Sequence, residues 1–478
     1  MKNKNYLFNL LFLATFLIAC SGCSKKTNID NQKPETKTDI EQDEKNELSD
    51  DEIANIQTYF SDVLSEKYVT YTVNDEIRLD DLKAEQDKIW EIWKNANISF
   101  SEKKLIDLGA LADKNHDNWP LPQNLEANVV MPYYWGSKGV KPNDGYPLFI
   151  YLHGSGDKNS EWSAGISLAN QFKDSPSAYF VPQIPSMRAY RWWHKSKQFA
   201  WEKLLRLSFI TGDIDQNKVY FMGISEGGYG SQRLASFYAD YLAGAGPMAG
   251  GEPLINAPVE NCRNIAFSLR TGAEDYGFYR NQFTKTAKDR FDAFEAKYPG
   301  SFVHFIDIIP GMGHGIDYFP TTPWLRKYKR NPYPKFVSWE NFPMDGRYRD
   351  KFYNLLVKER SNADDNTRSY YEMQINGNSV SLKVSEMTYT ATEKDQRWGI
   401  GMKYDRTYVP ANKGKVVIFF NDKLIDLNNE VSISVNGKLA FRGMLKLSRK
   451  NIVESCAAFF DPDRLYPASV EVDLSSLK

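Results

Sequence analysis

Hydrophobic and polar positions change their spacing several times along the chain, and each spacing predicts a different kind of structure. Apolar residues recur at helical intervals over 53–64, directly after a capping box formed by Ser49 and Glu52. A second stretch with helical spacing follows at 82–93. We therefore expect a short helical region at 49–118, to which the sequence assigns no chemistry.

From about residue 126 the pattern becomes an alternation of short apolar runs and longer amphipathic segments. The apolar runs lie at 148–152, 219–222, 265–267 and 302–309, and helix-length segments include 195–209 and 227–240. Apolar runs of this length, separated by helices, are typical of a mostly parallel sheet with helices on both faces. The pattern predicts an α/β catalytic domain over 119–364.

The last part of the chain shows strict alternation instead. Val380, Leu382 and Val384 alternate with polar residues, and so do the apolar positions of 431–435. The second run leads into Asn436-Gly437, which is a strong signal for a β-hairpin. This spacing predicts a small antiparallel β module over 365–478.

The N-terminus has the layout of a secretory signal. Lys2 and Lys4 precede an apolar run over 6–19, which is too short for a confident membrane-spanning helix. The run ends in Leu17-Ile18-Ala19-Cys20, which resembles the lipobox of bacterial lipoproteins. The resemblance implies that residues 1–19 are a signal peptide and that the sulfur of Cys20 is lipidated.

The N-terminal segment allows alternatives to lipidation at Cys20. Cys23 offers a second, poorer lipobox, and an ordinary secreted protein remains the alternative. Residues 20–48 are polar and hold almost no apolar anchor, so they predict a flexible tether. We expect export and a lipid anchor in the cell envelope, in the outer membrane.

Charge and cysteine content narrow the possible functions. The 478 residues carry 60 basic and 61 acidic side chains, so no global field indicates nucleic-acid binding. Cys262 and Cys456 are the cysteines outside the N-terminal segment, and we expect buried thiols rather than a disulfide framework. No Cys/His cluster has zinc-ligand spacing, so we expect neither metal nor cofactor.

The motif with the clearest chemistry is Gly223-Ile224-Ser225-Glu226-Gly227, a G-x-S-x-G sequence. Alone it is a weak signal, because chance produces it about once in six chains of this length. Its context is stronger, since a predicted strand runs into the motif and a predicted helix runs out of it. This placement is that of a nucleophile elbow, and it makes Ser225 the candidate nucleophile.

A serine hydroxyl needs a base to take its proton. Among the five histidines, His314 fits that role best, because it lies in a glycine-rich loop directly after the strand predicted at 302–309. His304 falls in the middle of that strand and is expected in the core. His116 and His194 fit the base position less well.

The triad acid is expected between serine and histidine, on a loop after another strand. Glu274 and Asp275 both follow the strand predicted at 264–269. Asp275 has the favoured spacing from Gly272, and Glu274 remains the alternative. The acid would hold the imidazole in the required tautomer.

Acyl transfer also needs backbone donors for the oxyanion. His153-Gly154-Ser155-Gly156 ends the strand at 148–152 and resembles the HGGG-type loop that supplies one donor. We assign that donor to the amide of Ser155, with Gly154 as the alternative. The second donor would be the amide of Glu226. His153 is then expected to be structural.

Together, these motifs resemble the α/β-hydrolase superfamily in order, spacing and strand context, across about residues 126–320. Within it, the chain is similar to secreted esterases of the feruloyl-esterase and polyhydroxybutyrate-depolymerase type, also labelled prolyl-oligopeptidase-like. The supporting stretches are Pro182-Gln183-Ile184-Pro185, Trp192-Trp193 and Gly212-Asp213-Ile214-Asp215. Glu226 departs from the small or apolar residue of many such esterases. The overall texture also resembles lipoproteins of Bacteroides-type polysaccharide degraders.

The resemblance and the export signal favour an esterase that acts on an acylated or methyl-esterified polysaccharide. Trp192 and Trp193 lie among arginines in a loop expected near the site, and exposed aromatics of this kind suit a sugar ring. Packing of one tryptophan beneath the elbow is the alternative. Two other functions stay open, a prolyl-oligopeptidase-like peptidase and an inactive glycan-binding surface lipoprotein.

Overall fold

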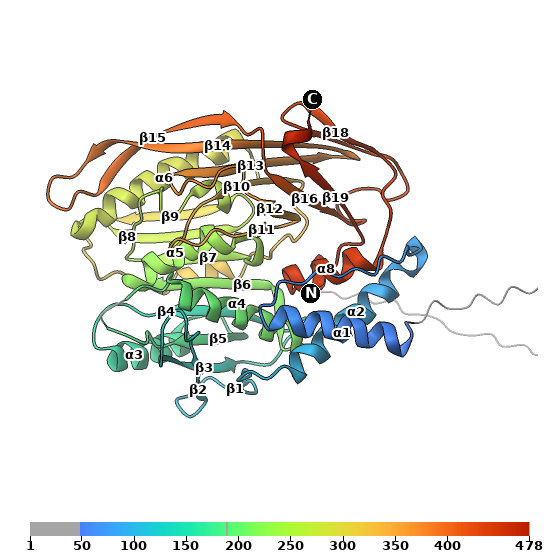
Figure 1. Cartoon of the computed structure of the whole chain (residues 1–478). Helices are drawn as coiled ribbons and strands as arrows, with labels where there is room; N and C mark the ends of the chain where they lie inside the picture. The colour runs from blue at the N-terminus through green and yellow to red at the C-terminus, as the bar shows by residue number, and fades with distance from the viewer. Residues whose placement is uncertain (1–47, 188–189, 478) are drawn as a thin grey trace, which may run out of the picture. The chain divides into compact units, whose positions relative to one another are not determined.

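The largest element of the protein is a nine-stranded sheet, seen in a computed structural model that describes residues 48–187 and 190–477 (Figure 1). In chain order its strands are β1 (Gly109–Ala110), β2 (His116–Pro120), β3 (Val130–Lys138), β4 (Tyr146–Leu152), β5 (Ser177–Pro182), β6 (Ile214–Ile224), β7 (Gly244–Met248), β8 (Ala266–Gly272) and β9 (His304–Ile309). Their spatial order is β1-β3-β5-β4-β6-β7-β8-β9, with β2 beside β3. All pairs from β5 to β9 are parallel, whereas β3 runs antiparallel to β5 and to β2.

Helices cover both faces of this sheet. They are α3 (Lys158–Gln171), α4 (Lys195–Ile210), α5 (Glu226–Tyr238), α6 (Arg280–Lys297) and α7 (Thr321–Leu325). Every residue of β4, β5, β7 and β8 is buried, which requires cover on both faces because side chains alternate between them. A mostly parallel sheet of this kind, with Ser225 at the turn from β6 to α5, is the α/β-hydrolase fold, as predicted.

Two further sheets follow the nine-stranded sheet along the chain. The six-stranded sheet contains β10 (Phe336–Asn341), β13 (Thr367–Asn376), β14 (Ser379–Lys394), β15 (Gly401–Pro410), β17 (Val431–Val435) and β18 (Lys438–Gly443). The four-stranded sheet contains β11 (Lys351–Phe352), β12 (Leu355–Glu359), β16 (Lys415–Phe420) and β19 (Ala468–Asp473). The predicted Asn436-Gly437 hairpin is present, because β17 and β18 pair around it and both residues have positive φ.

The C-terminal β structure is more extensive than the small module predicted at 365–478. It begins before residue 365, since β10 pairs with β13 along its whole length. It also contains one parallel pair, β14 with β17. The sequence pattern missed β10 because its buried residues do not alternate between apolar and polar side chains.

The two N-terminal helices pack against the C-terminal part of the chain. They are α1 (Asp50–Leu64), with the predicted capping box, and α2 (Leu82–Ser99), and both contact α8 (Arg449–Phe459). Arg449 donates to both oxygens of Glu85 at 3.0 Å and to Glu52 at 2.8 Å. Residues Ser49–Lys478 therefore form one compact unit. Short 3-10 helices complete the unit at Leu79–Asp81, Ala239–Tyr241, Val259–Cys262, Gly277–Tyr279, Pro462–Arg464 and Leu474–Ser476.

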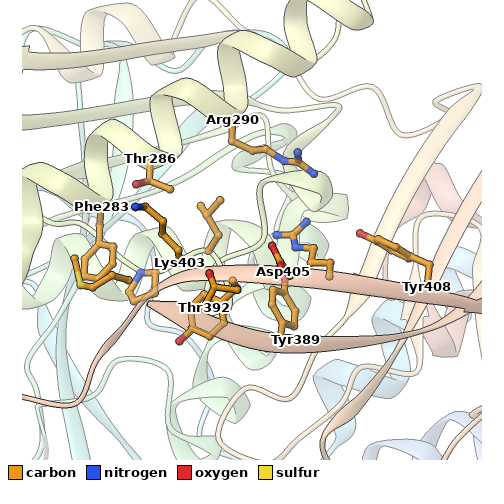
Figure 2. Close-up of a pocket in the computed structure, with 13 residues that line it drawn as sticks. Phe283, Thr286, Arg290, Tyr389, Thr392, Lys403, Asp405 and Tyr408 are labelled. Atoms are coloured by element: carbon orange, nitrogen blue, oxygen red, sulfur yellow. The ribbon is translucent and has the colours of Figure 1, made fainter. Parts of the chain in front are cut away.

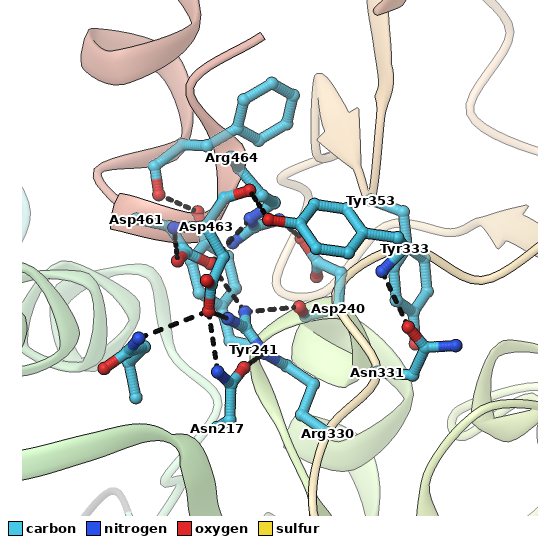
Figure 3. A network of polar contacts seen from close by, with 12 residues as sticks. Asn217, Asp240, Tyr241, Arg330, Asn331, Tyr333, Tyr353, Asp461, Asp463 and Arg464 are labelled. Atoms are coloured by element: carbon cyan, nitrogen blue, oxygen red, sulfur yellow. Dashed lines mark hydrogen bonds and ion pairs between the residues drawn. The ribbon is translucent and has the colours of Figure 1, made fainter. Parts of the chain in front are cut away.

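A buried network of charges joins the region of the nine-stranded sheet to the C-terminal part of the chain (Figure 3). Asp240 lies after α5 and accepts hydrogen bonds from Arg349, at 3.1 Å to one oxygen, and from Arg464, at 2.8 Å. Asp461 accepts from Arg464 at 2.8 Å and from Arg330 at 2.6 Å. All five side chains are nearly inaccessible to solvent. Each buried charge depends on its partners, because an unpaired charge in this environment is strongly unfavourable.

Membrane-spanning helices, metal-binding groups and cysteines can be checked in the part of the chain that the structure describes. Among residues 48–187 and 190–477, none of the helices has the length and apolar character needed to cross a membrane. Within the same ranges, no group of His, Cys, Asp and Glu side chains is arranged to hold a metal ion. Cys262 and Cys456 are buried free thiols, as expected. The predicted signal peptide and Cys20 lie outside the described residues.

The buried network makes a stability prediction. Asp240→Ala should lower the free energy of unfolding by about 3–5 kcal/mol, because it leaves Arg349 and Arg464 buried without their shared partner. Chemical denaturation followed by circular dichroism measures this. Asp289→Ala is the control, since it breaks a solvent-exposed pair with Lys285 and should cost no more than about 1 kcal/mol. Equal losses in the two variants would contradict the importance of the network.

Candidate active site

Ser225 lies at a tight turn between β6 and α5, with φ 57° and ψ −112°. This left-handed conformation is costly for a residue with a side chain, and it persists because the surrounding structure fixes it. A Cβ atom added at Gly227 would lie 1.9 Å from the carbonyl oxygen of Leu152, and one at Gly223 would lie 2.5 Å from the same atom. The turn therefore requires glycine at both positions, and its geometry is that of a nucleophile elbow.

Ser225, His314 and Asp275 form a continuous chain of hydrogen bonds. The Oγ of Ser225 lies 2.9 Å from Nε2 of His314, and Nδ1 of His314 lies 2.8 Å from Oδ2 of Asp275. Because a carboxylate only accepts, Nδ1 carries the proton and Nε2 is left to accept from the serine hydroxyl. The structure brings together all three residues predicted for the triad, each on the loop that follows a parallel strand.

The structure also separates Asp275 from the alternative acid, Glu274. Asp275 is only 3% exposed and points to His314, whereas Glu274 is exposed. Arg280, the first residue of α6, donates to Asp275 through Nε at 2.8 Å to each oxygen. Burial acts to raise the pKa of Asp275, but hydrogen bonds from Arg280 and His314 outweigh burial and lower the pKa overall. Asp275 is thereby kept charged.

No pattern in the sequence points to Arg280 as part of the site. It also donates to the hydroxyl of Tyr229 at 3.2 Å, and so links the acid to α5. Arg280 lies five residues after Asp275 and belongs to no recognisable motif. The two side chains meet because the first turn of α6 lies beside Asp275. Arg280 holds Asp275 and does not reach the serine in any contact that the structure records.

His153 organises the loop that follows β4. Its Nε2 accepts from the amide of Ile184 at 3.0 Å, while Nδ1 lies 2.7 Å from the carbonyl oxygen of Gly154. Burial lowers the pKa of His153 to about 4, so the ring is neutral at pH 7. This agrees with the structural role expected from the sequence.

The same loop lies against the nucleophile. A Cβ atom added at Gly154 would lie 3.5 Å from Cβ of Ser225. Burial raises the pKa of Glu161, and the amide of Gly154 opposes this by donating to the Glu161 carboxylate. The amides of Ser155 and Gly154, the predicted oxyanion donor and its alternative, both belong to this loop. The amide of Glu226 is in the first turn of α5, where amides have no acceptor within the helix.

The prediction of an exposed aromatic platform is wrong, because Trp192 and Trp193 are 0% and 6% exposed. Trp192 is the more enclosed of the two. This side chain is fully buried, and its indole donates to the carbonyl oxygen of His153 at 3.1 Å. It lies against α5 so closely that a Cβ atom added at Gly230 would approach it to 2.7 Å. Trp192 therefore packs under the elbow, which was the alternative interpretation of this loop.

Trp193 has a different environment. It is 6% exposed, and its ring lies 3.9 Å from the guanidinium carbon of Arg233, which binds Glu252 through two hydrogen bonds. Trp193 lines a cavity of about 670 Å³ next to the elbow. The remaining lining residues come from several segments: Met187, Tyr190, Arg191, Glu226, Tyr229, Arg233, Gly251, Glu252, Pro253, Asn256, Phe278, Phe283 and Ile400. Cavities of this size accept small organic ligands.

The Glu226 side chain lies in this cavity. Burial raises its pKa to about 7, and the charge of Glu252 adds to the effect, while Arg191 and Arg233 oppose it. A carboxyl group that titrates near neutral pH beside a nucleophile is a common property of functional sites. Glu226, which departs from the usual residue of the G-x-S-x-G motif, therefore lies in an environment that shifts its pKa.

The other histidines lie away from the serine. His304 is on β9, where its side chain is only 7% exposed and its ring lies 5.2 Å from that of Phe291, as expected for a core residue. Its Nε2 also lies 2.9 Å from Asp292. His116 is on β2, and His194 precedes α4. His314 is thus the histidine that faces Ser225.

Comparison with known proteins gives matches only at the level of structure. No family model matches the sequence, and a search of curated proteins finds no significant match. A thermostable esterase is 22% identical with a TM-score of 0.37, over 45% of this chain and 64% of the esterase, which is less than two thirds of that protein. A ferulic acid esterase from Anaeromyces mucronatus is 13% identical with a TM-score of 0.32, over 44% of this chain and 87% of that one.

An acetyl xylan esterase from Aspergillus awamori gives similar values, with 13% identity and a TM-score of 0.32, over 44% of this chain and 98% of that one. Because these TM-scores are all below 0.5, the function of this protein is inferred from its own site.

The raised pKa of Glu226 makes a prediction about pH. Its folded-state pKa of about 7 lies above the ordinary value of 4.5, so folding favours the protonated carboxyl group. The associated stability is fully present below pH 4.5 and is lost as the pH rises through about 7. Melting temperatures measured from pH 4 to 8 should therefore fall more steeply in the wild type than in Glu226→Gln. Glu274→Gln, which removes an exposed carboxylate, should leave the wild-type slope unchanged; an identical slope in Glu226→Gln would refute the assignment.

Proposed function

We propose that this protein is a serine hydrolase that cleaves a carboxylic ester through an acyl-enzyme, and that the ester is carried by a carbohydrate. The observation that carries the proposal is the hydrogen-bond chain from Asp275 through His314 to Ser225. This arrangement activates a hydroxyl group that is otherwise a poor nucleophile. Because both hydrogen bonds of the triad are present, the site also favours an enzyme over an inactive glycan-binding lipoprotein.

The proposed reaction uses each group in turn. Ser225 Oγ attacks the ester carbonyl carbon while Nε2 of His314 takes the hydroxyl proton. The negative charge that forms on the carbonyl oxygen is stabilised by the amides of Ser155 and Glu226. The histidine then gives its proton to the departing alcohol, and a water molecule activated by the same histidine releases the acid. Asp275 stabilises the imidazolium in both halves.

The carbohydrate part of the proposal is supported by the cavity next to the elbow. Tyr190, Trp193 and Tyr229 contribute aromatic side chains to it, and Arg191 and Glu226 contribute charge. Aromatic rings with polar groups at their edges suit a ligand that presents both apolar faces and hydroxyl groups. Of the two tryptophans predicted to bind substrate, only Trp193 belongs to this surface.

The first prediction tests the triad. Ser225→Ala and His314→Ala should each abolish nearly all hydrolysis of p-nitrophenyl acyl esters, leaving about 10³–10⁴-fold acceleration over water from the oxyanion donors and binding. The double variant should lose little more than either single one, because the members of a triad act as a unit. Steady-state kinetics with melting temperatures as a folding control measure this. Multiplicative losses, or retained activity in Ser225→Ala, would rule out the assignment.

The same assay separates esterase from peptidase. Peptide p-nitroanilides offered beside the esters should be hydrolysed far more slowly. A preference for the anilides would support the prolyl-oligopeptidase-like alternative.

We also propose that the protein is exported and anchored to the cell envelope, in the outer membrane, by lipid on Cys20. The lipobox-like sequence and the polar tether support this proposal. Cys20→Ala should move the protein from the membrane fraction to the soluble exported fraction, because each buried CH₂ of an acyl chain contributes about 0.8 kcal/mol. Cys23→Ala is the matched control and should stay in the membrane fraction. Release by Cys23→Ala alone would move the anchor to the second box.

A further inference from the structure

A second cavity, of about 520 Å³, lies between helix α6 and the β14–β15 ribbon (Figure 2). Thr286 and Arg290 face it from α6, while Lys403, Asp405 and Tyr408 face it from the ribbon (Figure 2). The complete lining is Pro253, Leu254, Phe283, Thr286, Arg290, Tyr389, Thr392, Met402, Lys403, Tyr404, Asp405, Arg406 and Tyr408. The reaction proposed above uses none of these residues.

The second cavity adjoins the cavity beside the elbow. Pro253 and Phe283 line both cavities, so the two share a wall. Ile400, at the turn between β14 and β15, lines the cavity beside the elbow. The two cavities are therefore neighbours, with α6 contributing Phe283 to both and the β14–β15 ribbon and its turn contributing to each.

The tip of the ribbon is attached to the loop of the triad acid. Trp398 packs on Phe278 with ring centroids 5.5 Å apart, and the hydroxyl of Tyr279 donates to Asp395 at 3.0 Å. Phe278 and Tyr279 follow Asp275 within four residues, and both have positive φ. The tip of the ribbon, although largely exposed, thus contacts the loop that carries Asp275.

Buried charges fix the other end of the ribbon. Glu260 accepts hydrogen bonds from Arg290 on α6, at 2.5 Å, and from Arg406 on β15. Glu340 on β10 accepts from the hydroxyl of Tyr389 at 2.9 and 3.0 Å. The two walls of the second cavity are therefore tied together, so its shape is present before any ligand binds.

The chemistry of the lining favours a sugar chain. Tyr389, Tyr404 and Tyr408 place three phenol rings along one wall, and Tyr408 is 43% exposed. Lys403 and Asp405 carry opposite charges at this surface, and the two arginines of the lining, Arg290 and Arg406, both donate to Glu260. All three rings offer a flat apolar surface, and Tyr404 and Tyr408 also offer hydroxyl groups, since the hydroxyl of Tyr389 donates to Glu340. This combination matches a chain of sugar rings better than an apolar ligand.

We propose that this groove between α6 and the β14–β15 ribbon binds the polysaccharide backbone that continues from the ester held at Ser225. The inference rests on the proposed esterase function and adds a second subsite to it. The C-terminal sheet then takes part in substrate recognition. Binding energy from this remote contact would favour long substrates over short ones.

Thr286→Trp tests the proposal, because Thr286 is an exposed residue on α6 and a bulky side chain there would fill the groove. The probes are acetylated xylo- and manno-oligosaccharides of increasing length, with p-nitrophenyl acetate as the short ester. In the wild type, kcat/KM should rise by about ten-fold or more with chain length. Thr286→Trp should remove that rise and leave the rate on p-nitrophenyl acetate within about two-fold of the wild type.

Two variants complete the design. Lys288→Trp places the same bulk on α6 outside the lining of the groove, and it should keep the dependence on chain length. Tyr404→Ala should reduce that dependence without filling the groove, which guards against misfolding of the tryptophan variant. If the wild-type protein does not hydrolyse p-nitrophenyl acetate, the proposed esterase function itself is refuted.

With the short ester cleaved, three results would overturn the sugar-chain subsite. These are a wild-type rate independent of chain length, a rise that persists in both Thr286→Trp and Tyr404→Ala, and a rise with the length of peptide methyl esters instead of oligosaccharides.

Discussion

The site depends on one steric constraint, the close approach of Gly227 and Gly223 to the carbonyl oxygen of Leu152. No side chain fits at either glycine, since an added Cβ atom would lie within 2.5 Å of that oxygen. The contact joins the end of β4 to the turn between β6 and α5. It therefore places three groups together: the serine at the turn, the first amide of α5, and the loop after β4 with the amide of Ser155. The positive φ of Ser225 is a consequence of the same constraint.

A second constraint relates the catalytic core to the C-terminal sheets. Asp240 and Asp461 are buried together with three arginines, and the buried Glu260 binds Arg290 of α6 and Arg406 of β15. Ion pairs of this kind are weak sources of stability but costly to break singly, so they fix relative positions. The consequence for function is that β14 and β15 form a wall of the proposed substrate path instead of a separate module.

The sequence predicts the part of the fold whose signals are local. The parallel sheet follows from apolar runs such as that of β4, and the elbow follows from glycine spacing around Ser225. Strand β7 is not visible in the same way, because Gly-Ala-Gly-Pro-Met lacks the branched and aromatic residues that mark a strand. The extent of the C-terminal sheets was underestimated because pairing between distant strands, as of β10 with β13, leaves no local pattern.

Among the candidate site residues, chain order and strand context suffice to select Ser225, His314 and Asp275. They do not show which tryptophan packs under the elbow and which lines the cavity, since Trp192 and Trp193 are adjacent and differ only in which neighbour each meets. The roles of Arg280 and of the β14–β15 ribbon depend on contacts between segments far apart in sequence. Such contacts follow from the assembled fold and from no motif.

The central claim is that Ser225 is the activated nucleophile. Reaction with a fluorophosphonate ester, followed by digestion and mass spectrometry, tests it directly, because such reagents phosphonylate a serine activated by a neighbouring base. We predict stoichiometric modification of the peptide that contains Ser225, and its loss in His314→Ala. Absence of modification in the folded protein, or modification of Ser155 in place of Ser225, would contradict the account.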